Sequence, residues 1–255
     1  MIVGLVMNKG GTGKTTTAVN LSAALAELGH SCLLVDGDGQ ASASRALGVS
    51  RPDLSPSLAE VLFGEIDVEK AVRPTERPGL HLLTGSRRLA EVDLHLAGDR
   101  KWHRRFRDAL KPVRGRFDFI VADAPPSFSL LMIGILAAAE FHLIPLTPQY
   151  LAVEGLENLK ESIRRLDGRV RFRARGSRIL FTIVDRRNRA TREMTELIRD
   201  FYGEEVFRTE IPINVKLSEA PRSGRDILRF DPSSPGAESY RALAREFLET
   251  VSTLP

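Results

Sequence analysis

The run Lys9–Gly10–Gly11–Thr12–Gly13–Lys14–Thr15 constrains the fold of this 255-residue chain more than any other segment. It directly follows the apolar run Ile2–Met7, and it leads into residues 15–28, whose apolar and small side chains recur with helical spacing. Glycines allow a loop to curl so that backbone N–H groups point at phosphate oxygens beside a helix N-terminus. A Gly-rich turn that binds nothing is the alternative, but strand, loop, Lys–Thr pair and helix in register favour a phosphate-binding loop.

Each residue type in this run has a chemical role in phosphate binding. Lys14 supplies a cation for the terminal phosphate oxygens, and Thr15 supplies a hydroxyl for a magnesium ion. The strict pattern G-x-x-x-x-G-K-[ST] fails, because its first position falls on Asn8. We expect the following residues to contact phosphates: Gly10, Gly11, Thr12, Gly13, Lys14, Thr15 and Thr16.

Three aspartates follow two apolar runs that have the length of strands. Asp123 ends the run Phe119–Ala122, and Asp36 and Asp38 end the run that begins at Cys32. An ordinary turn residue is the alternative for Asp123, because two prolines follow it. In a parallel sheet the strand ends meet at one edge, so these carboxylates are expected near the loop. We predict that Asp123 and Thr15 hold the metal, and that one of Asp36 and Asp38 orients the attacking water while the other completes the metal shell.

Strand-length apolar runs alternate with segments of helical period, which predicts an α/β fold. The expected architecture is a single domain over residues 1–255, a doubly wound and mostly parallel sheet with helices on both faces. The expected strands are Ile2–Met7, Cys32–Asp36, Leu80–Leu83, Phe117–Asp123, Phe141–Leu146, Arg178–Asp185 and Val206–Ile211. The expected helices are Thr15–Leu28, Leu58–Phe63, Val68–Val72, Leu89–Lys111, Phe128–Ala139, Val153–Leu166, Thr191–Tyr202 and Ala237–Val251.

Composition excludes several classes of protein. The single cysteine, Cys32, allows neither an intrachain disulfide nor a cysteine-rich metal site within one chain. The apolar start is too short for a signal-peptide core. The longest apolar run, residues 128–146, is interrupted by Glu140 and His142, so no membrane span is expected. Residues 238–255 are slightly acidic, which favours packing on the sheet over binding an anionic membrane.

Positive charge is concentrated in two segments. Residues 164–192 contain eleven arginines against two aspartates, and residues 100–116 contain eight basic residues against Asp108. Arg169, Arg171, Arg173 and Arg175 occupy every second position, so an extended segment would place them on one face. A surface that faces a polyanion and an ordinary solvated surface are both compatible with this pattern. RNA, an acidic protein or a membrane are further possible partners of the alternating arginines.

The loop run is similar to the deviant Walker A motif of the ParA/MinD ATPases, a family of P-loop NTPases. Residues 15–21 resemble the first helix of that family, residues 33–40 its Asp-x-Asp-Pro-Gln segment, and residues 123–126 the end of its Walker B strand. Residues 218–221 and 234–237 resemble sequences of the branch that partitions chromosomes and plasmids. The resemblance is weakest over residues 49–116.

The resemblance implies ATP and Mg²⁺ as cofactors and a homodimer that forms with ATP. It assigns Lys9, Lys14 and Asp38 to catalysis, with Lys9 reaching the phosphates bound by the other subunit. An exposed lysine beside the loop is the alternative for Lys9. Gly39 and Ala124 replace a proline and a threonine that are common in the family, so we expect hydrolysis to be slow. The resemblance further implies that a partner stimulates it.

The resemblance also implies non-specific DNA binding, with Arg187, Arg189 and Lys216 as the contacts. Ile213 stands where the family usually has an arginine, which removes one expected contact. The implied protein partner is a ParB-like or cargo-adaptor activator, and the implied location is cytoplasmic and nucleoid-associated, without a membrane. A MinD-like positioning scaffold that does not bind DNA is the second hypothesis. An ATP-dependent amide or ligase enzyme on the same scaffold is the third.

Overall fold

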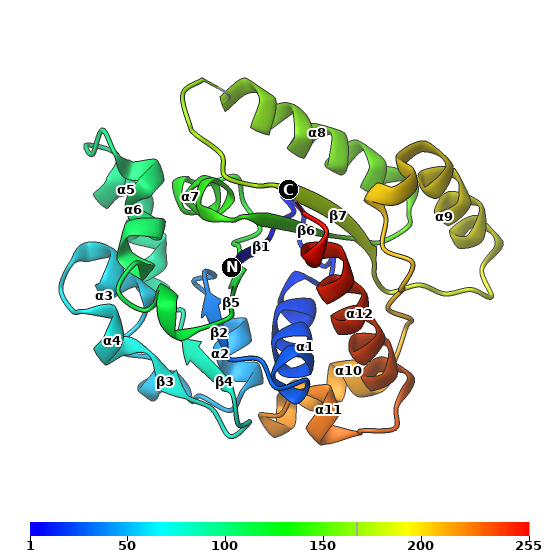
Figure 1. Ribbon diagram of the computed structural model, residues 1–255, viewed down its shortest axis with the longest axis horizontal. Coiled ribbons are helices and arrows are strands. Elements are labelled where there is room, and N and C mark those ends of the chain that lie inside the picture. The colour runs from blue at the N-terminus through cyan, green and yellow to red at the C-terminus, as the bar shows by residue number, and fades with distance from the viewer. Residues whose placement is uncertain (167, 255) are drawn as a thin grey trace.

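The computed structural model describes residues 1–166 and 168–254, and the side chains of residues 150–152 are left out of the description. Its centre is a seven-stranded sheet with the order β3-β4-β2-β5-β1-β6-β7 (Figure 1). All neighbouring strands are parallel except β3, which pairs antiparallel with β4. The strands are β1 (Ile2–Leu5), β2 (Cys32–Asp36), β3 (Arg73–Pro74), β4 (Leu80–Leu83), β5 (Phe119–Asp123), β6 (Phe141–Leu146) and β7 (Gly176–Phe181). The α/β expectation is therefore confirmed.

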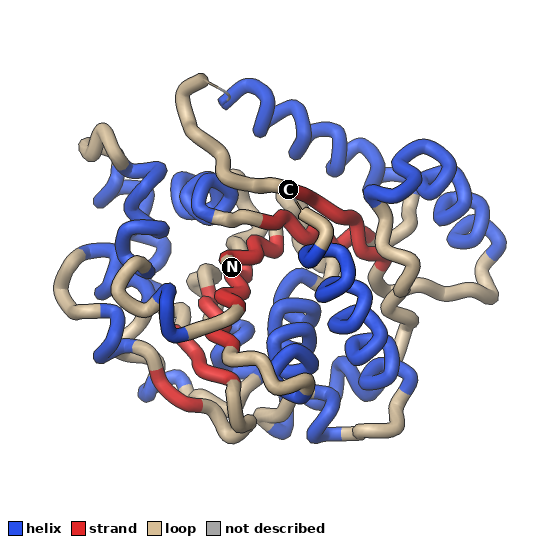
Figure 2. Tube along the Cα trace, viewed as in Figure 1, coloured by secondary structure: helices blue, strands red, loops and turns tan. Residues whose placement is uncertain are grey.

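Helices surround the strands in the trace, with the strands at the centre (Figure 2). In the first half of the chain they are α1 (Lys14–Glu27), α2 (Ser42–Ala46), α3 (Leu58–Phe63), α4 (Val68–Ala71), α5 (Val92–Leu96) and α6 (Trp102–Leu110). In the second half they are α7 (Leu130–Ala138), α8 (Tyr150–Leu166), α9 (Arg189–Tyr202), α10 (Val215–Glu219), α11 (Ile227–Phe230) and α12 (Pro235–Ser252).

Both faces of the sheet are buried, because side chains of opposite faces enter two different apolar cores. In β2, Leu33 and Val35 belong to the core shared with α3 to α9, whereas Cys32 and Leu34 belong to the core shared with α1, α2, α11 and α12. This alternation explains why the strands read as continuous apolar runs in the sequence.

The C-terminal helix α12 covers the sheet. Tyr240, Leu243, Ala244 and Phe247 are buried, and the Phe247 ring meets the ring of Phe119 in β5 at a centroid distance of 5.5 Å. The apolar stripe of α12 is thus used for internal packing, as we predicted from the sequence. Among the described residues, we find no helix that combines the length and the apolar character needed to cross a bilayer.

The expected strand at residues 206–211 is wrong. Val206 and Pro212 form only isolated bridges to the sheet, and proline has no N–H with which to extend a ladder. The N–H groups of Arg208 and Thr209 instead donate to the Glu246 carboxylate of α12, at 2.7 and 2.8 Å. The N–H groups of Phe207 and Ile211 still donate to carbonyls of β7 at 2.9 Å, but at Arg208 and Thr209 a carboxylate from a distant helix takes the place of a strand partner. Nothing in the local sequence pattern indicates this.

The expected long helix at residues 89–111 is divided in two. α5 ends at Leu96 and α6 begins at Trp102, with a turn around Gly98 and Asp99 between them. The Asp99 carboxylate accepts a hydrogen bond from the N–H of Lys101 at 2.7 Å, so its side chain satisfies a backbone group at the start of α6. The α2, β3, α10 and α11 elements, each of two to five residues, were not predicted.

Candidate functional site

The Gly-rich loop lies between the end of β1 and the start of α1. Gly11 and Gly13 have φ angles of +75° and +77°, which any residue with a side chain adopts only with strain. Gly13 caps the N-terminus of α1, and no side chain caps the first-turn N–H groups. These amides and the positive end of the helix dipole therefore remain available to an anion.

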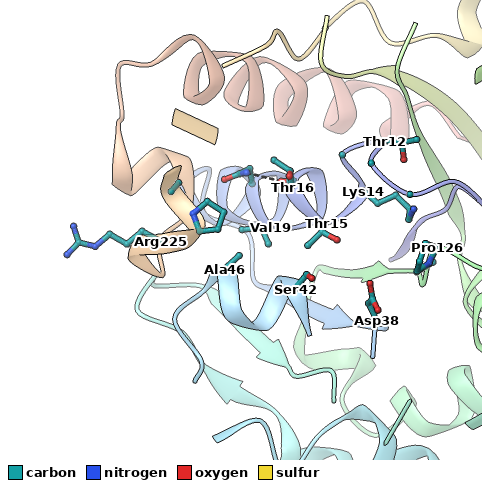
Figure 3. A pocket seen from close by; sticks show the side chains of 17 residues that line it. Thr12, Lys14, Thr15, Thr16, Val19, Asp38, Ser42, Ala46, Pro126 and Arg225 are labelled. Atoms are coloured by element: carbon teal, nitrogen blue, oxygen red, sulfur yellow. Dashed lines mark hydrogen bonds between the residues drawn. The ribbon is translucent and has the colours of Figure 1, made fainter. Parts of the chain in front are cut away.

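A cavity of about 390 Å³ opens against this loop (Figure 3). All seven residues that we expected to contact phosphates line it, and so does Asp38. Further lining residues come from α1, α2, the segment after β5 and the segment before α11: Val19, Asn20, Ser42, Ala46, Ala124, Pro126, Ala220, Pro221 and Arg225. The sequence pattern therefore identified the phosphate end of the cavity, whereas the remaining walls come from segments far along the chain.

Lys14 is buried, and its ammonium Nζ donates a 2.9 Å hydrogen bond to the backbone carbonyl of Lys9. Burial lowers the pKa of Lys14, while the nearby carboxylates of Asp123 and Asp38 act in the opposite direction. The Lys14 cation is thus held across the loop by a neutral carbonyl. A phosphate group is a stronger partner for an ammonium ion than a carbonyl is.

Thr182, directly after β7, holds the Gly-rich loop in place. Its hydroxyl donates a 2.9 Å hydrogen bond to the carbonyl of Thr12. A Cβ atom built on Gly13 would lie only 3.4 Å from the Thr182 side chain. The loop is therefore anchored to a strand that lies two positions from β1 in the sheet, which keeps its curl in place before any ligand binds.

Asp36 is fully buried, and both of its carboxylate oxygens are engaged. One oxygen accepts hydrogen bonds from the N–H and the hydroxyl of Ser44 at 2.8 and 2.6 Å, and the other accepts from the N–H of Asp38 at 3.2 Å. Burial raises the pKa of Asp36, and the Ser44 hydrogen bonds oppose that shift. Neither Asp36 nor Asp123 lines the cavity. Asp36 differs in that its hydrogen bonds to Ser44 and to the N–H of Asp38 occupy both oxygens, so in this structure it fixes the turn that carries Asp38.

Asp123 is also fully buried, but neither of its oxygens has a hydrogen-bond partner among the described residues. Burial, followed by the charge of Asp36, raises the pKa of Asp123 to about 8, while Thr15 and Lys14 oppose the shift. A buried carboxylate without partners is costly unless a cation neutralises it. This orphaned group beside Thr15 and Lys14 therefore fits the environment of a magnesium ion.

The residue types at the site suit magnesium bound together with phosphates. No group of three or more His, Cys, Asp or Glu side chains with metal-site geometry occurs in the described part of the chain. Magnesium commonly uses one or two protein ligands and completes its shell with water and substrate phosphates. One hydroxyl and one free carboxylate are enough for that arrangement.

Asp38 lies at the edge of the cavity, on the turn after β2 (Figure 3). One of its carboxylate oxygens accepts a 2.9 Å hydrogen bond from the N–H of Gln40. The turn packs closely on its neighbours, because a Cβ at Gly37 would lie 2.6 Å from the Asp123 carbonyl and one at Gly85 would lie 2.6 Å from the Asp38 carbonyl. These glycines allow the ends of β2, β5 and β4 to converge beside the loop.

The three expected DNA contacts lie on two neighbouring segments. Arg187 and Arg189 follow β7, Lys216 lies in α10, and the N–H of Ile213 donates to the carbonyl of Val184 between the two segments. Each of the three cations has an acidic partner: Arg187 pairs with Asp185, Arg189 with Glu193 and Lys216 with Glu219, at 2.9, 2.6 and 2.9 Å. All three are exposed.

Comparison with known proteins now decides the family. The family model described as an AAA domain matches residues 1–175. The chromosome partitioning protein ParA of Caulobacter vibrioides strain NA1000 is 36% identical over 249 residues, which cover 97% of this chain and 93% of that protein. The chain belongs to the ParA family of ATPases. A second ParA-family relative, the chromosome-partitioning ATPase Soj of Thermus thermophilus, is 39% identical over 98% of this chain and 96% of its own length.

A solved structure resembles this ParA-family chain in its fold. The cobyrinic acid a,c-diamide synthase of Mycobacterium smegmatis, with a bound ATP analog and magnesium, superposes with a TM-score of 0.85 and 28% identity, covering 100% of this chain and 98% of that one. The resemblance to the ParA/MinD family that we inferred from the motifs is confirmed.

Some contributors to the site were missed in the sequence. Ser44, which holds Asp36, and Arg225, which lines the cavity, belong to no short motif. Asn20 donates to the carbonyl of Thr16 and accepts the N–H of Ile227, so it ties α11 to α1 beside the cavity. Its place within residues 15–21, which resemble the first helix of the family, was an available signal.

Proposed function

We propose that this ParA-family chain binds ATP with Mg²⁺ in the 390 Å³ cavity and hydrolyses it slowly, with stimulation by a partner protein. The observation that carries the proposal is the convergence of a curled glycine loop, a lysine whose ammonium is bonded to a backbone carbonyl, and an orphaned carboxylate. Residues 10–13 supply backbone N–H groups, and Lys14 exchanges the Lys9 carbonyl for phosphate oxygens. Magnesium supplies charge neutralisation at the transferring phosphoryl group when it is bound.

Each protein side chain has a separate task in this proposal. The Thr15 hydroxyl and the Asp123 carboxylate hold the metal. Asp36, which is hydrogen-bonded to Ser44, fixes the turn that carries Asp38. Asp38, at the edge of the cavity, accepts a hydrogen bond from the attacking water and orients it. Asp38 is carried on a turn fixed by backbone hydrogen bonds, so it is positioned before ATP binds.

Lys9 links the site to dimerisation. Its side chain has no acidic partner among the described residues, whereas its carbonyl accepts the Lys14 ammonium. We propose that the Lys9 ammonium contacts the phosphates of the facing subunit. A cation placed in trans stabilises charge only when two nucleotide-loaded subunits meet, so ATP would favour the dimer through its higher affinity for that state.

The dimer is proposed to bind DNA without sequence preference through Arg187, Arg189 and Lys216, and a ParB-like or cargo-adaptor protein is proposed to trigger its release. Exposure of the three cations supports this role. Their acidic partners favour the second candidate, a MinD-like positioning scaffold that does not hold DNA, because each carboxylate reduces the net positive charge that these residues present to a phosphate.

A gel shift with a DNA duplex separates the two candidates. The protein is incubated with ATP, with ADP or without nucleotide, at several salt concentrations. The DNA-binding proposal predicts a shift with ATP alone, and an affinity that falls steeply with salt, by ~10³-fold or more between about 50 and 200 mM if six phosphates are contacted. The absence of a shift at low salt would select the scaffold.

A further inference from the structure

A second hollow, of about 230 Å³, lies between α6, α7 and the segment that joins α8 to β7. Figure 1 shows this segment leaving the end of α8 and passing α7 before it enters β7. The hollow is where the two basic segments of the sequence meet. None of its lining residues is acidic, and they are His103, Arg104, Arg107, Ala137, Arg171 and Arg173.

The hollow lies at the opposite edge of the sheet from the nucleotide cavity. α7 follows the end of β5 and returns to the start of β6, and Ala137 lies in its last turn. Arg173 likewise precedes the start of β7 by three residues. Since parallel strands start at one edge and end at the other, the hollow and Lys14 are separated by a strand length of about 15–20 Å. A ligand in the hollow would not compete with ATP for the glycine loop.

The positive charge of the hollow is largely unbalanced. Among the residues that the structure describes, Arg104, Arg171 and Arg173 have no acidic partner, and Arg107 has only its neighbour Asp108, at 2.7 Å. This differs from Arg187 and the other expected DNA contacts, each of which is paired. Cations gathered in a concave surface repel one another, so a multivalent anion placed between them is stabilised.

The imidazole of His103 lies in the same region of positive electrostatic potential. Its pKa is lowered, first by burial and then by the charges of Arg104 and Arg107, whereas Asp99 and Asp108 act in the opposite direction. The two acids do not line the hollow, and the charges of the two arginines outweigh theirs at His103.

The walls of the hollow are fixed by apolar packing beneath it. Val170 is buried and Phe172 is half-buried, in a cluster that also contains Ile133 and Ala137 of α7. Side chains of an extended segment alternate, so anchoring residues 170 and 172 places Arg171 and Arg173 together on the other side. Arginines presented by a fixed backbone bind phosphates with a smaller loss of conformational freedom than mobile ones do.

We propose that this hollow binds a small multivalent anion of the oligophosphate class, independently of the ATP site. Guanidinium groups contact phosphate oxygens through paired N–H donors, which suits the four arginines present. The hollow is smaller than the nucleotide cavity, 230 against 390 Å³, so it fits linked phosphate groups better than a nucleic-acid duplex. The proposal does not depend on DNA binding by Arg187, Arg189 and Lys216.

Isothermal titration calorimetry measures the binding of inorganic pyrophosphate to the full chain. The chain carries Lys14→Ala, so that the phosphate end of the nucleotide cavity no longer binds the probe. Adding Arg104→Gln or Arg171→Gln to this background should weaken pyrophosphate binding about 10-fold or more. Arg245→Gln, which removes an exposed arginine of α12 that lies outside the hollow, is the matched control and should leave the affinity unchanged. No pyrophosphate binding in the Lys14→Ala protein, or equal affinities in all three double variants, would overturn the proposal.

A second arm distinguishes a small anion from nucleic acid. The same arginine substitutions, made in the otherwise unchanged chain, are compared in a duplex gel shift. The proposal predicts that Arg104→Gln and Arg171→Gln affect DNA binding no more than Arg245→Gln does. A selective loss of DNA binding in these two variants, without pyrophosphate binding to the Lys14→Ala protein, would assign the hollow to nucleic acid and refute the oligophosphate site.

Discussion

The ammonium of Lys14 donates a 2.9 Å hydrogen bond to the backbone carbonyl of Lys9, five residues earlier. This contact closes the glycine loop on itself and joins the two lysines to which the ParA family resemblance assigns a catalytic role. The Lys14 cation is thereby held near the place where phosphates would lie. Only the backbone carbonyl of Lys9 takes part in this hydrogen bond, so the bond does not engage the Lys9 ammonium.

Replacement of Lys14 by alanine should remove most of the ATP affinity. Charge-assisted hydrogen bonds to phosphate contribute about 3 kcal/mol, so their loss corresponds to a ~100-fold larger dissociation constant. Titration with a fluorescent ATP analogue measures the effect. Lys9→Ala is the control and should leave the affinity of the monomer for ATP unchanged. Unaltered binding in the Lys14→Ala protein would exclude the glycine loop as the phosphate site.

Replacement of Asp123 by asparagine should stabilise the ligand-free protein increasingly as pH rises. The pKa of this carboxyl is about 8 in the folded protein and ~3.9 in an unfolded chain, so between these values the folded state binds more protons than the unfolded state. The contribution of Asp123 to the free energy of unfolding therefore decreases from about pH 4 to about pH 8, and Asp123→Asn removes this loss.

Urea unfolding at pH 6, 7 and 8, without nucleotide or magnesium, measures the difference between the two proteins. The advantage of Asp123→Asn should grow by on the order of 1 kcal/mol per pH unit and level off above pH 8. Asp185→Asn is the control, because Asp185 is only half-buried and its pKa is lowered, not raised, by its hydrogen bonds to Arg187. A difference that does not change with pH would contradict the raised pKa of Asp123.

The ion pair of Arg77 with Asp226 should contribute strongly to stability. It is bidentate, with bonds of 2.9 and 2.7 Å, and the side chains are 10% and 2% exposed. Arg77→Ala leaves a buried carboxylate unpaired, which costs about 3–5 kcal/mol in the free energy of unfolding. Arg241→Ala breaks the more exposed pair with Glu27 and should cost ~1 kcal/mol or less. Equal losses in the two variants, from chemical denaturation, would refute this ranking.

The phosphate end of the site was predictable because its chemistry is local. The glycines, Lys14 and Thr15 adjoin in sequence, and the loop conformation requires those residue types at those positions. The buried faces of β2 and β5 were predictable for a similar reason, since strands covered on both sides read as apolar runs.

The features that could not be predicted depend on partners far away in the chain. The Asp36 carboxylate is occupied by Ser44 of α2, a helix too short to show periodicity. Glu246 of α12 accepts the N–H groups of residues 208 and 209 and prevents the strand that their sequence suggests. The arginines of the second hollow were visible as two charged segments, but only the fold brings Arg104 and Arg171 together.

The central claim is that ATP in this cavity closes two subunits against each other through Lys9. Size-exclusion chromatography with light scattering tests it most directly, on the Asp38→Ala protein, in which hydrolysis should be slow. We predict twice the 28.2 kDa chain mass with ATP and magnesium, the single-chain mass with ADP, and the single-chain mass with ATP when Lys9→Ala is added. A single-chain mass for the ATP-loaded Asp38→Ala protein, or a full dimer that persists without Lys9, would contradict the account.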